Sequence, residues 1–215
     1  MNRNALVLLP LQLVRSALDK AGLLGTPYIP RDFHPTVVVQ IDFPQTGATV
    51  QLGNELEPSQ GQGDPVVSFV AQDPSDQQGT FCLVSYDPDA PSRENQEFGP
   101  WRHYIAGGLK PKSFDEITST ADRSSERNLA SQALVQQTEE PLSPWVAPSP
   151  GKGTGLHRYC FALYKQNGGP LKPLSEQSTI KSNERPDRRK FDVATFAKEN
   201  DLELVGFNYF LCKNV

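Results

Sequence analysis

The chain has 215 residues, of which 37% are hydrophobic, and its formal net charge is −4. This length suits a single domain, 1–215, that can bury a core without disulfides or a metal ion. The negative charge excludes the broad basic surface that nucleic-acid binding requires, so we expect no nucleic-acid partner. No apolar run reaches the length that a membrane-spanning helix needs.

The three cysteines, Cys82, Cys160 and Cys212, are too few and too widely spaced for a disulfide framework. Each lies in an apolar run, which predicts buried thiols in a reducing compartment. We therefore expect a cytoplasmic protein, and a vacuolar or membrane-associated pool stays open. We also expect a monomer. A catalytic thiol at Cys160 is the less favoured interpretation.

The N-terminal residues 1–25 predict a helical extension. Leu11, Val14 and Leu18 recur at helical spacing, and two glycines follow at positions that would end a helix. The apolar residues 5–9 also loosely resemble a secretory signal, although a proline interrupts them. A retained helix and a removed targeting peptide both remain open, and we prefer the helix.

The remainder of the chain predicts mostly β-structure, because β-branched and aromatic residues gather in short runs separated by segments rich in proline and glycine. The expected strands are 36–43, 66–71, 80–86, 101–106, 157–164 and 202–210, with Gly107 and Gly108 ending the fourth. Helical spacing favours a helix at 189–200 and, more weakly, one at 122–137, whereas 141–155 should form an ordered loop. These elements predict an antiparallel β-sandwich with a few peripheral helices.

The segment from Asp87 to Arg93, which directly follows the third expected strand, is the part of the sequence that says most about function. Asp87 and Asp89 are two residues apart, so on an extended segment their carboxylates would point the same way. Pro88 and Pro91 fix dihedral angles and remove backbone donors, so the segment cannot continue a sheet ladder. Taken alone, the two carboxylates would more simply bond nearby backbone in turns. The histidines that follow on neighbouring strands favour a ligand site instead.

Two of the three histidines lie near the beginnings of expected strands. His103 follows Trp101, and His157 precedes Tyr159 and follows a glycine-rich loop ending at Gly155, where backbone N–H groups can approach a ligand. A carboxylate beside a histidine raises the pKa of the imidazole, and the imidazolium can hold phosphate, sulfate or carboxylate. The sequence therefore predicts a pocket lined by aspartate, histidine, tyrosine and tryptophan that holds an anion.

Other site chemistries have weaker support. An aspartate and two histidines could form a metal triad, but their order and spacing do not match known metal motifs, so we expect no metal and no cofactor. Ser92 is the only hydroxyl nucleophile expected near the cluster, and no G-x-S-x-G turn occurs. The basic run from Arg185 to Lys190 is interrupted by Asp187, and a solvated surface explains it better than a nucleic-acid patch.

Three motifs in this order resemble the phosphatidylethanolamine-binding proteins, also known as Raf kinase inhibitor proteins. They are Asp-Pro-Asp-Ala-Pro-Ser-Arg at 87–93, Trp-x-His at 101–103 and Gly-x-Gly-x-His-Arg-Tyr at 153–159, and the resemblance extends over 11–210. Within the family the chain looks most like the fungal, carboxypeptidase Y inhibitor-like branch. The resemblance implies a β-sandwich with peripheral helices. It also implies a pocket at one end of the sheet for phosphate-bearing ligands such as phospholipid head groups, with peripheral membrane contact left open.

The resemblance also implies which residues bind the ligand. They are Asp87, Asp89, Trp101, His103, Gly155, His157 and Tyr159. Two departures concern the pocket mouth. The loop 147–151 reads Ala-Pro-Ser-Pro-Gly where the family has Gly-Pro-x-Pro-Pro, and the chain stops soon after its last expected strand, where animal members add a helix. We therefore expect a mouth that is more open, or one that the N-terminal helix covers.

Three functional hypotheses follow. The preferred one is a regulatory protein that binds an anionic ligand and uses a separate surface, involving the N-terminal segment, to inhibit a serine carboxypeptidase or regulate signalling. The second is an isomerase, lyase or esterase for a small fungal metabolite. In that enzyme Asp87 would orient His103 as a proton shuttle, and His157 would hold an oxyanion with loop N–H groups. The third is a scaffold that has lost its ligand. Whether the chain is an enzyme stays open.

Overall fold

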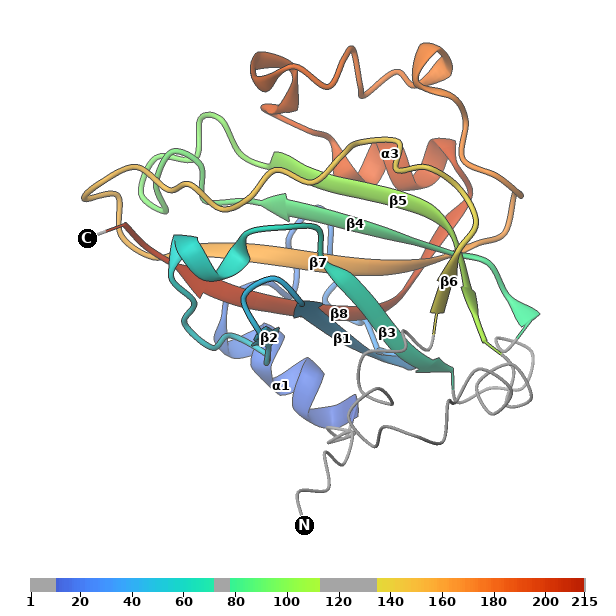
Figure 1. Cartoon of the computed structure of the whole chain (residues 1–215), viewed down its shortest axis with the longest axis horizontal. Coiled ribbons are helices and arrows are strands. Elements are labelled where there is room, and N and C mark those ends of the chain that lie inside the picture. The colour runs from blue at the N-terminus through green and yellow to red at the C-terminus, as the bar shows by residue number, and fades with distance from the viewer. Residues whose placement is uncertain (1–10, 72–77, 113–134, 215) are drawn as a thin grey trace.

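The computed structural model describes residues 11–71, 78–112 and 135–214. Its helices and strands in chain order are α1 (Leu11–Lys20), β1 (Val37–Phe43), β2 (Ala48–Val50), η1 (Pro58–Gly61), β3 (Val66–Ala71), β4 (Phe81–Asp87), β5 (Trp101–Pro111), β6 (Val135–Gln137), β7 (His157–Gln166), η3 (Leu174–Glu176), η4 (Arg185–Arg188), α3 (Val193–Glu199) and β8 (Leu202–Cys212), as Figure 1 shows. The η elements are short 3₁₀-helices. In the described ranges, no helix combines the length and the apolar character that crossing a membrane requires.

The strands of the described residues belong to one curled sheet (Figure 1). Their order is β2-β1-β8-β7-β4-β5-β6, and β3 pairs with β1. β1 and β8 run parallel at Val37 and Gly206, while the other pairs are antiparallel. β3 also contacts β5 and β6, so the sheet curls back on itself. The expected mostly β fold with a few peripheral helices is confirmed, whereas its strands form a single mixed sheet instead of an antiparallel sandwich. A parallel pair needs a long connection between its strands, and the chain between β1 and β8 supplies one.

Both faces of the sheet are buried. On β7, Tyr159, Phe161 and Leu163 point into the cluster enclosed by the curl. Cys160 and Ala162 point to the opposite face, where their cluster includes buried side chains of α1 and α3. This alternation was predicted for the strand and follows from its two-residue period. Every residue of β4 is buried, so the strand that leads to Asp87 is firmly held.

The N-terminal helix is confirmed at Leu11–Lys20, and its buried side chains are Val14 and Leu18. Gly22 adopts a φ of 64°, and the Leu23 N–H donates to the Leu18 carbonyl at 2.9 Å, an arrangement that ends a helix. Residues 1–10 of the expected extension lie outside the described residues.

The glycine pair 107–108 does not end β5, which corrects the expected boundary. Gly108 adopts a φ of 65°, and the pairing with β4 shifts between Phe81–Leu109 and Leu83–Ala106. The glycines thus form a bulge, after which the strand continues to Pro111. The expected helix at 122–137 lies mostly outside the described residues, and its last part, Val135–Gln137, is strand β6 instead. β6 is a strand because it pairs with the continuation of β5.

Helix α3 begins at Val193, later than the expected 189. Lys190 has a φ of 52°, which interrupts a helix, and the Asp192 carboxylate accepts the Thr195 N–H at 2.9 Å as an N-cap. Asn200 caps the other end, as expected. Of the residues expected in this helix, none before Val193 is helical, and the preceding 3₁₀-helix η4 ends at Arg188.

Candidate functional site

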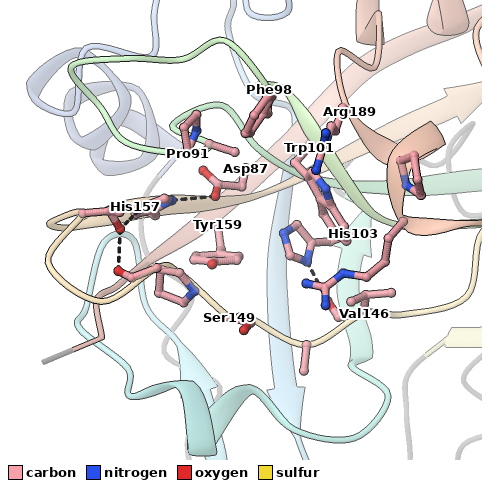
Figure 2. A pocket seen from close by; sticks show the side chains of 17 residues that line it. Asp87, Pro91, Phe98, Trp101, His103, Val146, Ser149, His157, Tyr159 and Arg189 are labelled. Atoms are coloured by element: carbon pink, nitrogen blue, oxygen red, sulfur yellow. Dashed lines mark hydrogen bonds and ion pairs between the residues drawn. The ribbon is translucent and has the colours of Figure 1, made fainter.

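A cavity of about 450 Å³ opens where β4, β5 and β7 meet. Asp87 ends β4 and pairs with Trp101, which begins β5, while β7 begins at His157 on the other side of β4. Antiparallel pairing therefore brings the end of one strand and the beginnings of two others to one edge. Five of the predicted site residues line the cavity, namely Asp87, Trp101, His103, His157 and Tyr159 (Figure 2).

The carboxylate of Asp87 pairs with His157. Asp87 Oδ2 lies 2.7 Å from His157 Nδ1, and His157 Nε2 lies 2.9 Å from the hydroxyl oxygen of Thr154. The remaining oxygen of Asp87 accepts the Asp89 N–H at 2.7 Å. Burial raises the pKa of Asp87, and the hydrogen bond and charge of His157 oppose this rise. The Asp87 carboxylate and the His157 ring therefore form a buried pair at the edge of the sheet.

His103 has a different partner from the one expected. Its Nδ1 lies 2.6 Å from the Val146 carbonyl, which can only accept, so Nδ1 carries the proton (Figure 2). Burial lowers the pKa of His103 to about 3, although the bond to Val146 opposes the shift. His103 is therefore neutral at physiological pH. The expected imidazolium, and the expected pairing of His103 with Asp87, are both wrong because His157 takes that carboxylate.

Aromatic rings surround His103 at the buried end of the cavity. Its ring centroid lies 4.4 Å from that of Trp101 and 4.9 Å from that of Tyr159. With Nδ1 committed to Val146, Nε2 remains as the acceptor of the ring. This buried end of the cavity can therefore accommodate an apolar or aromatic group, and His103 can accept one hydrogen bond from it.

Asp89 does not line the cavity, although it was expected among the ligand-binding residues. It is fully buried, and Arg158 binds it through the backbone N–H, Nε and Nη2 at 2.9, 2.9 and 2.6 Å. Gln96 donates a further hydrogen bond at 2.9 Å. The bond from the Asp89 N–H to Asp87 forms a turn, so the two carboxylates diverge. Arg158 lowers the pKa of Asp89 against the opposing effect of burial, which keeps it ionised.

Gly155 also lies outside the cavity lining. Its φ is 81°, a left-handed backbone conformation that favours glycine, and a Cβ there would meet no atom within 4 Å. No residue of α1 lines the cavity either. The expected helical cover of the mouth is therefore not formed by the described part of the N-terminal extension.

The loop between β4 and β5 forms one wall, to which Pro91 and Phe98 contribute. Its Ala90–Pro91 and Gly99–Pro100 peptide bonds are cis. A Cβ on Gly99 would lie 2.3 Å from the Pro88 carbonyl oxygen, so only glycine allows the two sides of the loop to approach this closely.

The lining residues that the sequence argument missed include Thr154, Arg185 and Arg189, whose side chains carry hydrogen-bonding groups. Thr154 lies three residues before His157, a spacing that could have suggested the contact. The arginines belong to the run interpreted as a solvated surface. They reach the cavity because the N–H groups of Lys190 and Phe191 donate to the carbonyls of Phe98 and Pro100 at 3.0 and 2.9 Å, and no local sequence signal predicts that docking. Among the described residues, no cluster of three or more His, Cys, Asp or Glu side chains could hold a metal ion.

Comparison with known proteins concerns the sequence as a whole. The family model described as phosphatidylethanolamine-binding protein matches residues 46–210. The carboxypeptidase Y inhibitor of Saccharomyces cerevisiae is 28% identical over 208 residues, which cover 89% of this chain and 90% of that protein. An uncharacterized protein of the same yeast, YLR179C, is 28% identical over 175 residues, covering 77% of this chain and 76% of that protein.

Solved structures extend the comparison to the fold. The carboxypeptidase Y inhibitor, solved in complex with its cognate proteinase, superposes with a TM-score of 0.74 at 27% identity, over 97% of this chain and 98% of that one. A phosphatidylethanolamine-binding protein from Plasmodium vivax has a TM-score of 0.64 at 23% identity, over 94% of this chain and 97% of that one, and supports the fold alone. The family model covers most of the chain, and the chain belongs to the phosphatidylethanolamine-binding protein family.

Proposed function

We propose that this protein binds a small anionic ligand in the cavity and that it inhibits a serine carboxypeptidase. The observation that carries the first part is the charge balance of the cavity lining. Its one carboxylate, Asp87, is paired with His157, whereas two guanidinium groups, those of Arg185 and Arg189, have no carboxylate partner among the described residues. A hollow with this balance favours anions over cations.

Calorimetric titration tests ligand binding directly. We expect saturable binding of short-chain dihexanoyl phosphatidylethanolamine or of phenyl phosphate, and much weaker binding of benzyl alcohol, which has a ring but no phosphate. Binding should weaken as salt rises, because exposed cations contribute to it. Failure of every phosphate-bearing probe to bind would reject an anion-binding function for the cavity.

Inhibition of a carboxypeptidase is supported by similarity over nearly the whole chain. The carboxypeptidase Y inhibitor matches at 28% identity in sequence and at a TM-score of 0.74 in structure. We expect this protein to reduce the activity of purified carboxypeptidase Y when titrated at micromolar concentration. If the inhibiting surface is separate from the cavity, the Arg185→Ala/Arg189→Ala variant should inhibit as well as the wild type. Undiminished peptidase activity at a large excess of wild-type protein would reject this function.

The second candidate, an acid–base enzyme, is favoured by the line of groups from Asp87 through His157 to Thr154, joined at 2.7 and 2.9 Å. When Nδ1 of His157 donates to Asp87, Nε2 can accept a proton from a hydroxyl group. The Thr154 hydroxyl also has the Gly151 carbonyl within 2.7 Å, a competing acceptor for its proton. Hydrolysis of p-nitrophenyl esters that is lost in His157→Gln would support an esterase, and hydrolysis no faster than in buffer would reject it.

A further inference from the structure

The cavity divides into two parts that differ in burial and charge. We define the floor as the buried lining residues Asp87, His103, His157 and Tyr159 together with the half-buried Trp101, and the rim as the exposed lining residues Arg185 and Arg189. The floor carries no net positive charge, because the His157 ring is paired with the Asp87 carboxylate at 2.7 Å and burial keeps His103 in its neutral form. The positive charge of the cavity is therefore at its rim.

The rim arginines are held in place by the backbone around them. Between them lies Arg188, which is buried and donates to the carbonyls of Arg102, His103 and Pro144 at 3.2, 3.3 and 3.1 Å. These bonds fix η4 to the beginning of β5. The guanidinium carbon of Arg189 also lies 4.3 Å from the centroid of the Phe98 ring, a cation–π contact that orients it beside the cavity (Figure 2).

From this arrangement we propose that Arg185 and Arg189 bind the anionic group of the ligand at the rim, while the rings of Trp101, His103 and Tyr159 take an apolar part of the same ligand. This rests on the proposed anion-binding function and specifies the ligand. It is an amphiphilic anion, in which a phosphate or carboxylate is joined to a ring or short hydrocarbon group. Guanidinium groups suit such anions because they donate two parallel hydrogen bonds.

Two consequences distinguish this ligand from a simple anion. Inorganic phosphate should bind more weakly than phenyl phosphate, because it leaves the rings of the floor exposed to water. Phenol should also bind more weakly, because it leaves the guanidinium groups without an anion. The anionic part and the apolar part of the ligand therefore contribute separately to the binding affinity. Each contribution can be removed by its own substitution in the protein.

The test is calorimetric titration of phenyl phosphate into wild-type protein, Arg185→Ala/Arg189→Ala, and the control Lys181→Ala, which removes an exposed cation that does not line the cavity. We expect the double variant to lose at least about tenfold in affinity and most of the salt dependence, and the control to bind as the wild type does. The replaced side chains are exposed, so an unchanged melting temperature should show that the double variant folds. The affinity of an Arg185→Lys/Arg189→Lys variant for phenyl phosphate should lie between those of the wild type and the double alanine variant. Lysine keeps the positive charge but cannot donate two parallel hydrogen bonds as arginine does.

Equal affinity of the double variant and the wild type would overturn the inference and place the anion on the floor, with anion binding itself intact. No binding by the wild type would instead reject the proposed function, and this inference with it. Dihexanoyl phosphatidylethanolamine, titrated in parallel, distinguishes the sources of the phosphate. Tighter binding than phenyl phosphate identifies a lipid head group, and weaker binding identifies a free organic phosphate.

Discussion

Arg158 holds Asp89 in a two-pronged ion pair and links it to the N-terminal helix. Nη2 and Nε of Arg158 lie 2.6 and 2.9 Å from the two carboxylate oxygens of Asp89, and Nη1 donates to the Ala21 carbonyl at 2.7 Å. The segment that carries Asp87 into the cavity is thereby connected to the end of α1. Asp89, expected to bind ligand, instead positions the residue that does line the cavity.

Breaking this pair should destabilise the protein. The side chains of Asp89 and Arg158 are 0% and 9% exposed, so Arg158→Met would leave a buried carboxylate without its cation. We expect the free energy of unfolding to fall by about 3–5 kcal/mol in urea titrations. Hydrogen exchange at the end of α1 should also accelerate. Arg93→Ala is the matched control: its half-exposed guanidinium lies 3.5 Å from Asp89 and should cost under about 1 kcal/mol. Equal losses from both variants would contradict the assigned role of Arg158.

The neutral state of His103 predicts a pH dependence of stability. Its pKa is about 3 in the folded protein and 6.5 in an unperturbed chain, so below pH 6.5 the unfolded state binds the proton more readily. Stability should therefore fall as the pH decreases through this range, by up to about 1.4 kcal/mol per pH unit. His103→Gln, which can still donate to Val146, should remove this slope. His34→Gln, at an exposed histidine, should retain it. A wild-type slope in His103→Gln would show that His103 is not held neutral.

Gly99 cannot carry a side chain, because the two sides of the loop between β4 and β5 approach each other closely at this residue. In Gly99→Ala the new Cβ would lie 2.3 Å from the Pro88 carbonyl oxygen, so backbone must move, and we expect a loss of about 1–3 kcal/mol in thermal or urea unfolding together with weaker ligand binding. Gly153→Ala is the control for backbone conformation alone: its φ is 77°, and its Cβ would meet nothing within 4 Å. The Gly153→Ala variant should lose stability without disturbing the loop that carries Phe98. Full ligand affinity in Gly99→Ala would contradict the importance of this wall.

Tryptophan fluorescence offers a local report of ligand binding. Trp101 lines the cavity, whereas Trp145 packs against the inner core and donates to the Gly61 carbonyl at 3.1 Å. A ligand on the floor should change the emission of the wild type, and Trp101→Phe should abolish the change while Trp145 still fluoresces. An unchanged response in Trp101→Phe would mean that the ligand does not contact this ring.

The sequence predicted the parts of the site that depend on local pattern. The alternation of β7 placed Tyr159 on the inner face, and the run before Asp87 predicted a strand that delivers it to the edge of the sheet. The family followed from motifs that are contiguous in the chain, and the comparison with known proteins confirmed it.

The parts that depend on contacts distant in sequence could not be predicted. Which histidine meets Asp87 depends on the register across β4 and β7, and on the turn that directs the two carboxylates apart. The rim arginines reach the cavity because Lys190 and Phe191, which follow η4, form backbone hydrogen bonds to a loop about 90 residues earlier in the chain. The run of charged residues contains no sign of that docking.

The most direct test of the account is a crystal structure of the protein grown with phenyl phosphate. We predict phosphate density against the guanidinium groups of Arg185 and Arg189, with the phenyl ring against Trp101 and His103. A cavity that stays empty at saturating ligand, or that holds the phosphate at His157 away from both arginines, would contradict it.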